Sequence, residues 1–185
     1  MKNMIVMTDD DSSVQPVQST DLPDKQELHV DIQIALTDTL VGEKVPSECQ
    51  LEQWARLAYY HVNSRKSLSD NNEVTLRLVD AAEIQELNER YRGKNKPTNV
   101  LSFPFEVPEG VDMELLGDIV ICHQVVIAEA ESQGKSAYQH YAHMVTHGIL
   151  HLCGYDHQEP GEADEMESLE IDILSSIDLP NPYTI

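Results

Sequence analysis

The sequence lacks any apolar run long enough to cross a bilayer. A membrane-spanning helix needs about 20 consecutive apolar residues, and no stretch of this 185-residue chain approaches that length. The beginning of the chain, MKNMIVMTDDD, also lacks the extended apolar core of a secretory signal. These absences exclude a membrane protein and predict a cytoplasmic location.

Cysteine is also scarce. Cys49, Cys122 and Cys153 are widely spaced and form no CxxC pair, which argues against a disulfide framework and against a thiolate zinc site. The hydrophobic fraction of 41% is ordinary for a globular protein. We expect one domain over residues 28–185 and a disordered acidic extension over residues 1–27, which is rich in Asp, Ser, Gln and Pro.

Basic residues are few, with 12 Lys and Arg against 33 Asp and Glu and a formal net charge of −21. A protein that binds nucleic acid through phosphates is expected to carry a basic patch. One such patch, here called the basic strip, lies where acids are nearly absent and consists of Arg90, Arg92, Lys94 and Lys96. The strip is a candidate RNA-binding surface, and a solvated charged loop is the alternative.

Apolar periodicity and capping signals predict the fold class. Strands are expected at 28–35, 73–79, 99–105 and 117–122, the third at a sheet edge because Pro104 lacks a donor. Helices are expected to begin at Ser47, Asp80, His123, Ser136 and Pro160. Tyr91 is expected on the buried side of its helix. The order of elements predicts an α+β domain with a mixed four-stranded sheet packed by helices.

The helix that begins at Ser136 carries a stripe of histidines: His140, His143, His147 and His151. His147 and His151 are four residues apart, so their imidazoles lie one turn apart on one side and can reach a single ion. Gly154 permits a left-handed turn that brings His157 back toward them. The string HGILHLCGYDH therefore predicts a zincin-like H-x3-H-x5-H metal site at the helix end.

Three neutral imidazoles leave one zinc coordination position open, as in catalytic sites. Gly148 stands where zincin proteases have their general-base Glu, which weakens a peptidase interpretation, and a phosphodiester suits a cationic site beside the basic strip. His143 is the rival ligand, but His143 and His151 are two helical turns, about 11 Å, apart. We expect His143 and His140 to orient a ligand or contact RNA.

The segments YRGKNKPTNVLSFPF, LLGDIVIC and HGILHLCGYDH, in this order, resemble the YbeY family, and the similarity covers about residues 28–183. The resemblance implies a single-strand-specific endoribonuclease that matures ribosomal RNA, above all the 3′ end of 16S rRNA, and takes part in ribosome quality control. It implies zinc on His147, His151 and His157, an essential Arg92, and the small ribosomal subunit and its assembly proteins as partners.

Individual roles follow from side-chain chemistry. Arg92 is expected to bind phosphate and act in catalysis with the metal ligand His147, since a guanidinium can hold two phosphate oxygens. Asp156 is a candidate to orient a ligand histidine. Asp118, in an otherwise buried strand, is another, with pairing to Arg92 or a structural capping role as alternatives. A metalloprotease and a non-catalytic assembly factor with structural zinc remain competing functions.

Overall fold

The computed structural model describes residues 28–37, 44–66, 72–105, 115–156 and 160–184. The acidic extension 1–27 and the third predicted ligand, His157, lie outside the described residues. No helix within the described ranges is long and apolar enough to cross a membrane.

The strands form one mixed sheet of four strands in the order β1-β2-β4-β3, which confirms the predicted sheet. β1 pairs with β2 and β2 with β4 in parallel, whereas β3 pairs antiparallel with β4 and occupies the predicted edge. The strand bounds are β1 His29–Ala35, β2 Glu73–Val79, β3 Val100–Pro104 and β4 Leu115–Cys122.

The described residues also form five helices, and the caps of two of them follow the sequence. Asp80 accepts hydrogen bonds from the first turn of its helix, which ends at Gly93 in the left-handed conformation. Ser136 and Gln139 form the reciprocal capping box that opens the histidine helix. The helix bounds are α1 Glu48–Lys66, α2 Ala81–Arg92, α3 His123–Ser132, α4 Ala137–Leu152 and α5 Pro160–Ser175.

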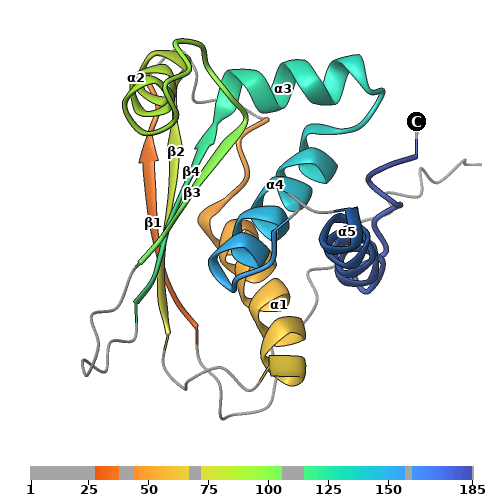
Figure 1. Ribbon diagram of the computed structural model, residues 1–185. Helices are drawn as coiled ribbons and strands as arrows, with labels where there is room; N and C mark the ends of the chain where they lie inside the picture. Colours follow the sequence, from red (N-terminus) through yellow and green to blue (C-terminus); the bar gives the residue numbers. More distant parts are fainter. Residues whose placement is uncertain (1–27, 38–43, 67–71, 106–114, 157–159, 185) are drawn as a thin grey trace, which may run out of the picture.

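The helices are arranged in layers (Figure 1). α1 and α4 pack on one face of the sheet, and α5 lies on the far side of α4. The main core fills this side, whereas a smaller core under α2 includes Ile84, Val120 and Cys122 on the opposite face. α4 is thus covered on two sides, which explains why even polar residues of this helix are buried.

Two burial expectations were wrong. Tyr91 is 58% exposed because it lies in the last turn of α2, where its ring meets Phe103 edge-on at 5.0 Å between centroids and the Arg90 guanidinium lies 5.5 Å from its centroid. Asp118 is exposed although its strand is mostly buried. Alternation along β4 directs Asp118 to the same face as Val120, and that end of the face is not covered by α2.

Candidate metal centre

The histidine stripe of α4 lies against α3 and α5 and is held by hydrogen bonds. His140 and His143 are buried, and His147 and His151 are half-buried. The ring centroids of His143 and His147 lie 6.2 Å apart, and those of His147 and His151 lie 4.5 Å apart. The histidine rings therefore lie closest together at the C-terminal pair of the stripe, His147 and His151.

The four histidines use different ring nitrogens. His140 and His143 use Nε2, at 2.8 Å from Glu129 and 3.1 Å from Glu170. His147 and His151 instead use Nδ1, at 2.8 Å from Glu170 Oε1 and 3.0 Å from the Tyr155 carbonyl oxygen. As a result, only His147 and His151 direct their Nε2 atoms toward each other.

The Nε2 atoms of His147 and His151 are 3.1 Å apart. Two nitrogens bound to one tetrahedral zinc ion at about 2.0–2.1 Å lie about 3.3 Å apart, so the pair fits a shared ion. Gly154 adopts the predicted left-handed conformation after the helix, with φ of 81°. The structure thus brings together two of the three predicted ligands, and a metal bound there would find their outer nitrogens already fixed.

Glu170 of α5 is a candidate site residue that the sequence analysis missed. Its carboxylate has no solvent exposure and accepts hydrogen bonds from His143, His147 and the Tyr183 hydroxyl. Burial alone raises the pKa of Glu170, but the hydrogen bonds and charges of His143 and His147 lower it to about 2. The carboxylate is therefore ionised and fixed beside His147.

Three side chains each offer one ligand atom within 4.8 Å of the other two, so they could hold a metal ion: His143, His147 and Glu170. A carboxylate bound to the outer nitrogen of a metal-ligating histidine is also a recurrent arrangement in metalloproteins. The same contacts therefore support either ligation by Glu170 or orientation of His147 by Glu170.

The centre opens into a cleft of about 310 Å³ between α4, α5 and the start of β3. His143, His147 and Glu170 line one side, and Asn99 and Val100 line another. His147 is therefore one of the residues that line this cleft.

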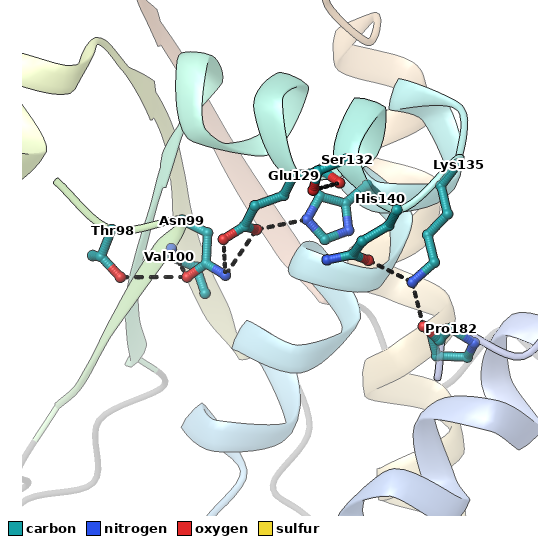
Figure 2. Close-up of polar contacts among 9 residues, drawn as sticks. Thr98, Asn99, Val100, Glu129, Ser132, Lys135, His140 and Pro182 are labelled. Carbon is teal, nitrogen blue, oxygen red and sulfur yellow. Dashed lines mark hydrogen bonds and ion pairs between the residues drawn. The ribbon is translucent and has the colours of Figure 1, made fainter. Parts of the chain in front are cut away.

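A second polar chain links this cleft to His140 (Figure 2). The Asn99 amide donates to both oxygens of Glu129 at 3.2 and 3.5 Å, and Glu129 Oε2 lies 2.8 Å from His140 Nε2. The His140 contact keeps the pKa of Glu129 below its ordinary value. These hydrogen bonds hold Asn99 in the wall of the cleft. They also direct His140 Nε2 to Glu129, away from the metal pair.

The basic strip is exposed throughout. Arg92 ends α2, and the following loop is braced by a 2.7 Å hydrogen bond from the Asn88 amide to the Lys96 carbonyl oxygen. Across the described residues, no ion pair with a carboxylate involves the strip. Ion pairs do engage other described cations, namely Lys44, Arg56, Arg65 and Arg77.

Two acidic candidates lie in different surroundings. Asp118 faces the side of the sheet opposite Ile119, and Ile119 packs against α4, so the structure does not bring Asp118 to the histidines. Asp156 is half-buried and follows Tyr155, whose carbonyl holds His151. Of the two, only Asp156 is close to the metal pair in the chain.

The packing of Gly148 explains why this chain lacks the general-base Glu that zincin proteases have at this position. Gly148 faces the sheet, and a Cβ at this position would lie 2.8 Å from Ile119 Cγ2. α4 therefore approaches β4 closely at this point, and a carboxylate side chain would be directed into the core.

Known proteins match the chain over most of its length. The family described as Endoribonuclease YbeY matches residues 37–178. Curated relatives named Endoribonuclease YbeY are 51% identical over 155 residues in Alteromonas mediterranea and 49% identical over 154 residues in Colwellia psychrerythraea. Each match covers 83% of this chain, and 95% and 96% of the respective relatives.

The solution structure of TM1509 from Thermotoga maritima is also similar. It matches with a TM-score of 0.51 and 27% identity over 80% of this chain and 91% of that one. The histidine helix, the cleft and the sequence matches lead to one conclusion: the chain belongs to the endoribonuclease YbeY family.

Proposed function

We propose that this protein is a zinc-dependent endoribonuclease that cleaves single-stranded RNA during ribosomal RNA maturation, including the 3′ end of 16S rRNA, and in ribosome quality control. The observation that carries the proposal is the 3.1 Å approach of His147 Nε2 to His151 Nε2 in a chain of this family. The cleft beside the pair provides room for a phosphodiester.

His147, His151 and His157 would hold the ion. His143 is the weaker ligand candidate because its Nε2 already contacts Glu170, so we assign His143 and Glu170 to orientation of His147. A zinc ion held there supplies positive charge that polarises a phosphodiester and makes a water molecule more acidic. Glu170 adds negative charge behind His147, which makes the imidazole a better ligand.

The basic strip would bind the RNA backbone. Arg92 can contact two phosphate oxygens and stabilise charge that develops on phosphorus, whereas Arg90, Lys94 and Lys96 hold neighbouring phosphates. Cations without a carboxylate partner can bind an external anion without first breaking an internal ion pair. This property favours the strip over the paired cations elsewhere in the described chain.

The ribosome is expected to supply part of the binding. A chain with a formal net charge of −21 repels polyanions, so its affinity for free RNA should be weak and fall steeply with salt. The small ribosomal subunit and its assembly proteins are the partners that would deliver the RNA.

Cleavage of a labelled single-stranded rRNA fragment by metal-quantified protein tests this function. Wild type should cut the RNA and leave casein intact, whereas His147→Ala and Arg92→Glu should not cut. Analysis of product ends for cyclic phosphate distinguishes attack by water from attack by the ribose 2′-hydroxyl. Intact RNA with the zinc-loaded wild type, both free and within small-subunit particles, would contradict the proposal.

A further inference from the structure

The segment that follows α5, residues 176–184, turns back toward the histidine stripe. The Leu179 amide donates to the Leu174 carbonyl at 3.0 Å, which starts the turn. Lys135 donates to the Pro182 carbonyl oxygen (Figure 2), and Pro182 is buried. The Tyr183 amide donates to Asn181 Oδ1 at 2.8 Å. These contacts hold the segment in place ahead of Tyr183.

Tyr183 reaches the metal centre from this segment. Its side-chain hydroxyl donates to Glu170 Oε2, and its ring meets the His143 ring edge-on with 5.5 Å between centroids. Burial and the hydrogen bond to Glu170 raise the pKa of Tyr183, so the hydroxyl keeps its proton and remains a donor. Tyr183 also lines the cleft with His147.

The three donors divide between the two oxygens of Glu170. His147 uses Oε1, whereas His143 and Tyr183 share Oε2. A rotation of the carboxylate that improves either contact at Oε2 would disturb the contact at Oε1. The Tyr183 hydroxyl therefore restricts the orientation of the acceptor that fixes His147.

We infer that Tyr183 is a positioning residue that locks the Glu170 carboxylate and, through it, holds His147 with Nε2 presented to the metal. The inference rests on the proposed function, which it deepens. Tyr183 lies beyond residues 37–178, the range that the family match covers. The metal centre thus includes a residue from the segment after the matched domain.

Tyr183→Phe tests this role because it removes the hydroxyl and keeps the ring. Loss of a direct outer partner of a ligand costs about 10–100-fold in metal affinity, so loss of this more distant donor should cost about threefold to tenfold. Zinc affinity would be measured on apoprotein by competition with a chelator. Tyr138→Phe is the matched control: Tyr138 is also 42% exposed but packs edge-on against Trp54.

A double-mutant cycle distinguishes positioning from general stability. If Tyr183 acts through Glu170, Tyr183→Phe should change zinc affinity by less than about twofold in a Glu170→Gln background. An equal loss in both backgrounds would overturn the inference. So would an affinity of Tyr183→Phe equal to that of wild type and Tyr138→Phe, a comparison that does not depend on the folding of Glu170→Gln.

Histidine tautomers give a readout that needs neither metal nor activity. In ¹⁵N-labelled apoprotein at alkaline pH, wild-type His147 should be mainly the Nδ1–H tautomer, and Tyr183→Phe should lower that share. An unchanged tautomer ratio in Tyr183→Phe would overturn the inference whatever the RNA assay shows. Failure of wild type to cut RNA, with the tautomer shift and zinc effect intact, would overturn only the nuclease function.

Discussion

The histidine stripe and the basic strip differ in whether a carboxylate or carbonyl oxygen of the protein contacts their side chains. Each stripe histidine, from His140 to His151, contacts a carboxylate or carbonyl oxygen at 2.8–3.1 Å. The strip cations, from Arg90 to Lys96, are exposed, and no carboxylate pairs with them in the described chain. The histidines are thus fixed in advance, as a metal centre requires, and the proposed phosphate-binding groups are left open to an external anion.

Substitutions in the two regions should also differ in how they affect the stability of the fold. Removal of one partner of a buried hydrogen bond costs about 1–3 kcal/mol because the other group is left unsatisfied. Exposed substitutions away from packed features usually change stability by less than about 0.5 kcal/mol. Changes near Glu170 should therefore alter metal affinity and stability together, whereas changes in the strip should alter RNA binding or cleavage without a change in metal affinity or stability.

The largest effect is expected from His151→Ala, which tests the metal pair directly. Loss of a ligand should lower zinc affinity by more than the 10–100-fold that an outer partner costs, and RNA cleavage should fall with it. His61→Ala is a matched control, because His61 is also a helical histidine, with Nδ1 2.9 Å from the Leu57 carbonyl oxygen. Equal zinc affinities of the two variants would exclude His151 as a ligand.

Glu170→Gln should have the next largest effect. Gln keeps the shape but loses the negative charge that holds His143 and His147, so zinc affinity should fall about 10–100-fold. The free energy of unfolding should also fall, by about 1–3 kcal/mol. The control Glu165→Gln changes an exposed acid of the same helix. If Glu170→Gln bound zinc as tightly as wild type, Glu170 would not be part of the metal centre.

In the basic strip, Lys94→Ala and Lys96→Ala should weaken RNA binding without a loss of zinc. Each phosphate contact with single-stranded RNA contributes about 0.7 to the slope of log affinity against log salt. Each variant should therefore flatten the slope by about that amount. Lys44→Ala removes an exposed cation that is paired with Glu131, and it should leave the slope unchanged. If all three variants gave the same slope, the proposed difference between paired and unpaired cations would be wrong.

Local signals in the sequence predicted most of the fold. The capping box at Ser136 and the left-handed Gly154 define the histidine helix, and the four-residue spacing predicted the approach of His147 and His151. Glu170 was missed because its contacts depend on how α5 packs against α4. A signal was present: Glu170 is an acid within the apolar stripe of α5, beside Met166, Leu169 and Ile173.

The smallest effect concerns Glu129, which holds His140 but touches neither His147 nor His151. The His140 hydrogen bond lowers the pKa of Glu129, so the carboxylate stabilises the fold above the ordinary glutamate pKa, and this stabilisation is lost as pH falls through the lower folded value. In metal-free protein, Glu129→Gln should cost about 1–2 kcal/mol at neutral pH, and the difference from wild type should shrink below about pH 4. Glu131→Gln, an exposed neighbour, should cost less than about 0.5 kcal/mol. Zinc affinity should stay within about twofold of wild type, and a larger loss would show that His140 and the metal pair act as one unit.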